Sequence, residues 1–171
     1  MKSPAPGSVQ EHEAELGQLK VQMETHPFLQ GLSSEDLSTL ALYAMRTEFT
    51  PGQLVFKQGD IANRFYLILS GKVALETIAQ NRRPVVIQTI GAGEVLGWSW
   101  LFQPYTWRFD ARAVEPVQAI FFYGTRLREH CEEDLRFGHE VMRRVAEVAV
   151  RRLNAIRARL LEVLEGDAPK A

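Results

Sequence analysis

The stretch from Ile90 to Ala113 constrains the fold of this chain more than any other segment. Gly91, Gly93 and Gly97 lie in its first half, where a chain turns sharply or approaches another group at φ values that other residues avoid. All the tryptophans of the chain fall in the same stretch, at Trp98, Trp100 and Trp107. The pattern predicts a glycine turn that leads into a short aromatic helix.

The second half of this stretch alternates between two faces after Tyr105. One face carries Trp107, Phe109, Ala111 and Ala113, and the other carries Thr106, Arg108, Asp110 and Arg112. A period of two is typical of a half-buried strand. We therefore expect a strand whose inner face includes Trp107 and Phe109, with Arg108 on the outer face, where it can pair with Asp110.

Short apolar runs bounded by Gly, Pro or Asn surround this stretch, as expected for a sandwich or barrel. They are Thr47–Phe49, Leu54–Phe56, Phe65–Leu69, Val73–Ile78, Val85–Ile90 and Val117–Tyr123. Helical patterns come before and after them. One runs from Val9 to Glu24, a second begins near Ser34 with Ser33 or Ser34 as its cap, and Thr125 is the expected cap of a third.

The last helical pattern, from Asp134 to Glu165, contains no proline. An apolar seam repeats along it at steps of four and three, which is the spacing of a coiled-coil interface. The seam consists of Met142, Ala146, Ala149, Leu153, Ile156, Leu160 and Val163. We expect this helix to pair with its twin in a homodimer.

Composition limits the classes of function. Apolar residues make up 46% and charged residues 24%, and the net charge of -1 gives no reason to expect nucleic acid or an acidic membrane as a partner. The single cysteine, Cys131, fits a reducing cytoplasm. The start has no export signal, and no apolar run is long enough to span a membrane.

The sequence offers no candidate catalytic or metal-binding residues. No histidine lies between Pro27 and Glu129, so the strands cannot supply a histidine cluster for a metal. Ser99 has neither a nearby histidine nor a nucleophile-elbow motif. We expect a protein that is not an enzyme and that uses no metal or cofactor.

The order of motifs resembles the cyclic-nucleotide-binding domain, the effector module of catabolite-activator-type regulators. Three segments carry the resemblance: Lys57–Asp60, Phe65–Val73 and Ile90–Gly93. In Ile90–Ala113, Gly93 and Gly97 fall on the glycines of the family's phosphate-binding cassette, and this stretch is called the cassette below. The resemblance implies an eight-stranded antiparallel β-roll with N-terminal helices and a long C-terminal dimer helix, a mainly β fold.

The resemblance also identifies what this cassette lacks. Trp98 stands where the family has the Glu that binds ribose, and Trp107 stands where it has the Arg that binds the cyclic phosphate. Arg108 is the best remaining candidate for an anion contact, and the backbone amides from Gly91 to Gly97 are a weaker one. The candidate pocket residues are Gly97, Trp98, Ser99, Trp107, Arg108 and Phe109. A pocket filled by its own tryptophans and a pocket reshaped for another ligand both stay open.

These observations predict four parts of the chain. They are a disordered start and N-terminal helix (1–33), the β-roll (34–134), the dimer helix (135–165) and a tail (166–171), with no recognition helix for DNA. The chain is expected to be a stand-alone dimeric regulatory module, which binds an unidentified small-molecule effector and signals through an unidentified protein partner. The alternative is a structural or protein-interaction dimer with a tryptophan-filled pocket. In that interface we place Met142, Ala149, Leu153, Ile156 and Leu160.

Overall fold

The computed structural model describes residues 6–78 and 84–166. The chain divides into two compact units, Met1–Glu129 and His130–Ala171. The expected disorder at the start falls partly on residues 1–5, and most of the expected tail falls on residues 167–171. Both ranges lie outside the described residues.

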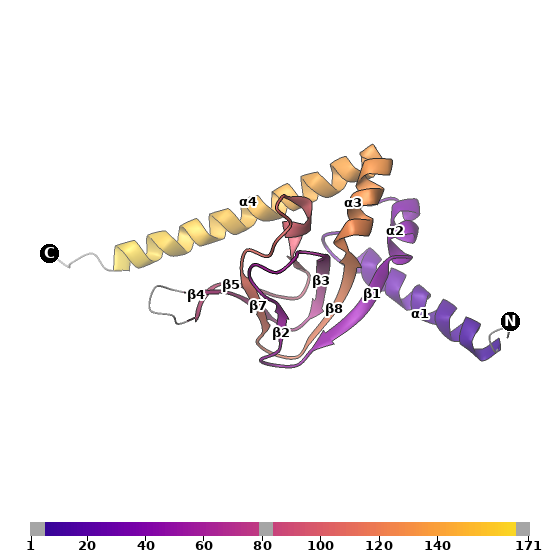
Figure 1. The fold of residues 1–171 in the computed structure, drawn as a ribbon, viewed down its shortest axis with the longest axis horizontal. Helices are drawn as coiled ribbons and strands as arrows, with labels where there is room; N and C mark the ends of the chain where they lie inside the picture. Colours follow the sequence, from indigo (N-terminus) through magenta and orange to yellow (C-terminus); the bar gives the residue numbers. More distant parts are fainter. Residues whose placement is uncertain (1–5, 79–83, 167–171) are drawn as a thin grey trace. The chain divides into compact units, whose positions relative to one another are not determined.

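Eight strands form the first unit together with several helices (Figure 1). The strands are β1 (Ala44–Phe49), β2 (Leu54–Phe56), β3 (Arg64–Ser70), β4 (Val73–Ile78), β5 (Pro84–Ile90), β6 (Val95–Leu96), β7 (Asp110–Ala113) and β8 (Val117–Tyr123). The helices of the chain are α1 (Pro6–Thr25), α2 (Ser34–Ala41), the 3-10 helix η1 (Trp98–Leu101), α3 (Gly124–Glu133) and α4 (Leu135–Gly166).

The strands form two four-stranded antiparallel sheets, with orders β1-β8-β3-β6 and β2-β7-β4-β5. The apolar sides of both sheets supply one core, because alternate residues of each strand face inward. This core includes Tyr66, Ile68, Val73, Leu75, Ile90, Leu96, Ala111, Ala113, Val117, Ala119 and Phe121. The predicted eight-stranded roll with flanking helices is therefore confirmed.

Side-chain caps fix two of the helix starts. Ser33 is the N-cap of α2, and its side chain accepts a hydrogen bond from the N–H of Asp36. A carboxylate oxygen of Asp134 accepts from the N–H of Phe137 at 3.0 Å, so Asp134 caps α4 in the same way. The expected cap at Thr125 is wrong, because α3 already begins at Gly124.

The strand expected from Trp107 to Ala113 is shorter than the alternating pattern predicted, because β7 begins at Asp110. The backbone of Trp107 is bonded elsewhere: its N–H donates to the carbonyl of Asp60 at 2.9 Å, and its carbonyl accepts from Gly59 at 3.0 Å. Arg108 and Phe109 therefore lie in a bend, where the period of two no longer sets which side chain faces inward.

Two further features of the described residues are a short strand and the character of the helices. The two-residue strand β6, which pairs with β3 through Val95 and Leu96, was not predicted from the sequence. In the ranges 6–78 and 84–166, no helix has the length and apolar character needed to cross a membrane.

Candidate ligand site

The cassette begins with a glycine turn that leads into η1. Gly97 is the residue before this helix and has a φ of 86°, a left-handed conformation that favours glycine. A Cβ built on Gly97 would lie 2.9 Å from two ring carbons of Trp107 and 3.2 Å from the carbonyl oxygen of Arg64. Gly97 is therefore required both by its backbone conformation and by the closeness of an indole ring.

Trp107 fills the space beside this turn. Its side chain is buried, with 4% of the residue exposed. The indole stacks on the ring of Phe56 from β2, with ring centroids 3.9 Å apart and an interplanar angle of 11°. Phe56 in turn stacks on Tyr66 of the core at 6.4 Å. The side chain at the position of the family's phosphate anchor is thus part of a continuous aromatic stack.

Trp100 is packed on the other side of the cassette. It is fully buried, and its ring meets Phe65 edge-on with centroids 5.9 Å apart. A Cβ added to Gly124 would lie 2.7 Å from the Cβ of Trp100, so only glycine fits at the start of α3. This tryptophan is a core residue, which ties η1 to the strands and to α3.

Arg128 of α3 contacts two residues of the cassette. Its guanidinium donates to the carbonyl oxygen of Trp100 at 2.6 Å and lies 4.4 Å from the ring centroid of Tyr105. These are a charge-assisted hydrogen bond and a cation–π contact. Neither Arg128 nor Phe56 was singled out from the sequence, because their partners lie far away along the chain and no local pattern indicates them.

The remaining predicted pocket residues lie nearer the surface. Trp98 and Ser99 are half-buried in η1, whereas Arg108 and Phe109 are exposed. The expected inward position of Phe109 is wrong, since 36% of this residue is exposed in the bend before β7. The structure therefore brings Gly97 and Trp107 together and leaves Arg108 and Phe109 outside the aromatic stack.

Arg108 also lacks the predicted ion pair with Asp110 in the described part of the chain. The carboxylate of Asp110 instead accepts from the backbone N–H of Gln58 at 2.7 Å and holds the turn before Gly59. The neighbouring cation, Arg112, pairs with Glu76 at 3.1 Å. Arg108 is thus an exposed cation at the surface of the cassette.

The turn after α1 lies against the glycine turn. His26 is buried, and its Nδ1 accepts from the N–H of Phe28 at 3.2 Å. Burial lowers the pKa of His26 below its ordinary value of 6.5, while the nearby backbone groups of Ile68 and Glu94 act in the opposite direction. The ring of Pro27 lies 3.4 Å from the Cβ position of Gly93.

The second unit carries the residues predicted for the dimer. Met142, Leu153, Ile156 and Leu160 are exposed in the single chain, and Ala149 is half-buried. Two arginines near the start of this row form ion pairs within the helix. Arg143 forms ion pairs with Glu140 and Glu147, and Arg144 pairs with Glu140 at 2.7 Å.

The chemistry available at the cassette is that of an apolar site. An indole offers one N–H donor, no acceptor and no charge, so Trp107 cannot replace a guanidinium that binds a phosphate through two hydrogen bonds. Among the side chains that the structure describes, no three His, Cys, Asp or Glu residues gather to hold a metal ion.

Comparison with known proteins decides the family. The family model of the cyclic nucleotide-binding domain matches residues 46–134, which is more than half of the 171 residues. The chain belongs to the cyclic nucleotide-binding domain family. The resemblance inferred from the motif order is thereby confirmed, and the matched range includes the cassette and all the strands from Arg46 of β1 onward.

Relatives in this family are regulators. The chain is 24% identical over 140 residues to the CRP-like cAMP-activated global transcriptional regulator of Mycobacterium tuberculosis, which is 82% of this chain and 61% of that regulator. It therefore spans less than two thirds of the regulator's length. This chain is thus a cyclic nucleotide-binding domain that is similar in sequence to a CRP-like regulator.

Solved structures show the same fold. A cyclic nucleotide-binding protein from Geobacter metallireducens is 31% identical, with a TM-score of 0.69 over 80% of this chain and 96% of that one. The regulatory subunit of a cAMP-independent protein kinase A from Trypanosoma cruzi, solved bound to guanosine, is 18% identical. Its TM-score is 0.59 over 80% of this chain and 52% of that one, a likeness of fold alone.

Proposed function

We propose that this domain is a non-enzymatic regulatory module that does not respond to cyclic AMP or cyclic GMP at micromolar concentration. The observation that carries the proposal is the burial of Trp107 between Phe56 and Gly97. An indole occupies the position at which the family places its phosphate-binding arginine. A nucleotide would have to displace a stacked ring and would find no charged partner at this position.

The free energy lost with these two contacts is large enough to prevent binding of a cyclic nucleotide at micromolar concentration. A hydrogen bond to a charged group contributes about 1.5–3 kcal/mol, and Trp98 and Trp107 replace two such anchors. Together the two losses weaken binding by about two orders of magnitude or more. Arg108 is the best candidate from the sequence that could compensate, and its side chain is exposed beside the stack.

The effector is then a molecule without a cyclic phosphate, apolar or able to stack on an aromatic ring. The guanosine bound to the related Trypanosoma cruzi subunit is a nucleoside, which carries no phosphate. The module acts as a homodimer through the seam of α4 and passes its signal to a protein partner. The exposed side chains of Leu153, Ile156 and Leu160 support this pairing, because such an apolar row is unfavourable in water.

A second candidate function is a structural or protein-interaction dimer that binds no ligand. The aromatic stack itself favours it, since Trp107 is 4% exposed and leaves its own position filled. Both candidates predict the same failure with cyclic nucleotides. They differ in whether any small molecule binds to the native state.

A thermal-melting series tests the proposal. The full chain is melted alone and with cyclic AMP, cyclic GMP or guanosine, because a ligand of the native state adds about 2.7 kcal/mol of stability at a hundredfold excess over its Kd. We expect no shift with either cyclic nucleotide. A shift with guanosine supports the effector module, and its absence supports the ligand-free dimer. A micromolar Kd for cyclic AMP that is abolished by Arg108→Ala would overturn the proposal and make Arg108 the phosphate anchor.

Restoring the family's Glu and Arg tests whether the two tryptophans prevent the binding of cyclic nucleotides. The variant Trp98→Glu, Trp107→Arg, Arg108→Ser places the expected acidic and basic groups in the cassette. If the two tryptophans are the cause, this variant gains affinity for cyclic AMP by calorimetry, whereas Trp98→Glu alone does not. The comparison requires that the triple variant still unfolds cooperatively.

A further inference from the structure

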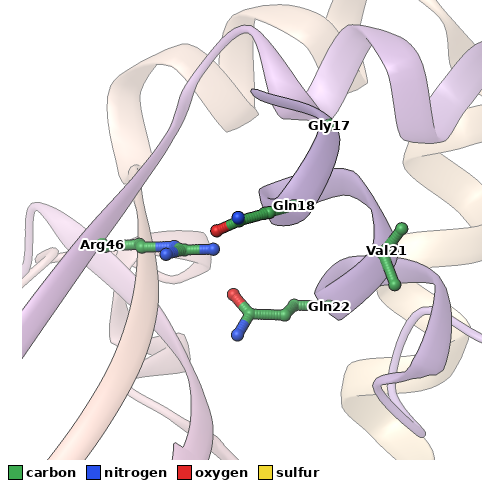
Figure 2. A pocket seen from close by; sticks show the side chains of 5 residues that line it. All are labelled: Gly17, Gln18, Val21, Gln22 and Arg46. Carbon is green, nitrogen blue, oxygen red and sulfur yellow. The ribbon is translucent and has the colours of Figure 1, made fainter. Parts of the chain in front are cut away.

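A groove lies between α1 and the edge strand β1, away from the cassette. Its volume is about 460 Å³, and it is lined by Gly17, Gln18, Val21, Gln22 and Arg46. In Figure 2 the side chain of Arg46 extends from β1 toward the helix, and the amide groups of Gln18 and Gln22 point back toward it. Three hydrogen-bonding side chains thus converge on one open space.

The polar atoms around this space are incompletely paired. The Oε1 atom of Gln22 is buried and accepts no hydrogen bond within the described structure. A buried acceptor without a donor is unfavourable, so a ligand whose N–H reaches this oxygen when the amide turns toward the groove would remove that penalty.

The guanidinium of Arg46 carries only donors and therefore needs an acceptor. It is exposed, and no acidic side chain of residues 16–78 or 84–162 forms an ion pair with it. Glu48, which follows on the same side of β1, is already engaged by the amide of Gln118 at 3.2 Å. Two N–H donors of a guanidinium can bind the two oxygens of a carboxylate at the same time.

Access to the groove follows from the order of the strands. Within the described sheet, β1 pairs with β8 on one side and has no strand on the other. The side chain of Val21 is 58% exposed beside the amides and offers a small apolar surface. A ligand can therefore enter along the free edge of β1 without displacing any part of the roll.

We propose that this groove binds a small organic carboxylate that carries an N–H donor and an aliphatic group next to the carboxylate. The carboxylate binds Arg46, the N–H donates to Oε1 of Gln22, and the aliphatic group lies on Val21. A free amino acid and the carboxyl end of a peptide share this chemistry. The proposal is independent of the function assigned to the cassette, since the residues that line the groove are different from those of the aromatic stack.

Titrations of the full chain followed by ¹H–¹⁵N NMR test the site with matched probes. N-acetyl-leucine carries both groups, N-acetyl-leucinamide lacks the carboxylate, and 4-methylpentanoate lacks the N–H. We expect N-acetyl-leucine to shift the amide signals of residues 17–22 and 46 and to bind more tightly than either matched probe. Free leucine identifies the source: equal binding indicates an amino acid ligand, and weaker binding indicates a peptide end.

Variants separate the groove from non-specific binding. Arg46→Ala should weaken N-acetyl-leucine by about tenfold or more, because a charge-assisted contact is lost. Gln22→Leu should abolish the preference for N-acetyl-leucine over 4-methylpentanoate. Arg126→Ala removes another exposed arginine, which pairs with Glu129, and should change nothing. Shifts that map elsewhere, equal binding of N-acetyl-leucinamide, or unchanged binding by Arg46→Ala would each overturn the proposal.

Discussion

The indole of Trp107 lies flat against the ring of Phe56, with ring centroids 3.9 Å apart and planes 11° from parallel. Phe56 belongs to β2, whereas Trp107 precedes β7, and the two strands pair in the same sheet. The stack therefore joins the end of the cassette to the strand that lies beside it. Removing the indole should lower the free energy of unfolding and leave a cavity beside Phe56.

Trp107→Ala should destabilise the domain strongly. Removing a buried aromatic side chain costs about 3–5 kcal/mol, because the lost packing is only partly recovered when the cavity relaxes. Urea denaturation of the purified variant measures the loss. Phe109→Ala is the matched control in the same segment, and because Phe109 is exposed the change should cost less than about 1 kcal/mol. Equal losses in the two variants would contradict the position assigned to Trp107.

Gly97→Ala should destabilise for two reasons that can be separated. The residue has a φ of 86°, and a new Cβ would meet the indole of Trp107 at 2.9 Å. Gly52 has a nearly equal φ of 83° with nothing within 4 Å of its Cβ position. Gly52→Ala therefore measures the backbone strain, about 1 kcal/mol or somewhat more. The excess loss in Gly97→Ala, again from urea curves, measures the close contacts with the ring and with the carbonyl oxygen of Arg64.

A double-mutant cycle checks that the ring causes this excess. In the background of Trp107→Ala the collision with the ring is absent and only the 3.2 Å contact with the carbonyl oxygen of Arg64 remains, so Gly97→Ala should cost less than it does in the wild type. Additive losses in the double variant would show that the indole and the glycine do not interact.

The sequence allowed the fold to be predicted because its signals are local. Turn residues such as Gly71 and apolar runs such as Phe65–Leu69 determine strand boundaries over a few residues. The site depends on contacts between distant segments. The alternating pattern predicted that Phe109 faces inward beside Trp107. The backbone of Trp107 instead accepts from Gly59 and donates to Asp60, and these bonds end the pattern before β7. Whether the tryptophans fill the pocket could not be decided without knowing that Phe56 lies beneath Trp107.

His26 should make stability depend on pH. Its pKa is lowered in the folded state, mainly by burial, so the unfolded chain binds the proton more tightly. Its contribution to stability is therefore complete above its ordinary pKa of 6.5 and is lost as the pH falls through the folded-state value. His26→Asn keeps an acceptor for the N–H of Phe28 but does not titrate. The difference in unfolding free energy between wild type and variant should shrink from pH 8 to pH 5, and a constant difference would contradict this role.

Leu153→Asp together with Ile156→Asp should convert the proposed α4 dimer to a monomer. Both side chains are exposed in the single chain and lie on the seam, where an unpaired buried charge would cost several kcal/mol. Sedimentation velocity measures the outcome. Asn154→Asp introduces a charge on the same turn away from the seam and should leave the dimer intact. A double variant that still sediments as a dimer would place the interface elsewhere.

The space beside the glycine turn is filled by the indole of Trp107, which is covalently attached to the chain. A tethered group acts at an effective concentration on the order of millimolar, whatever the surrounding solution contains. Any diffusing molecule that needs the same space must outcompete a side chain that never leaves. The tryptophan at position 107 thus sets a threshold concentration for ligands at the cassette, and the glycines that mark the family's nucleotide pocket are equally suited to holding a residue of the chain itself.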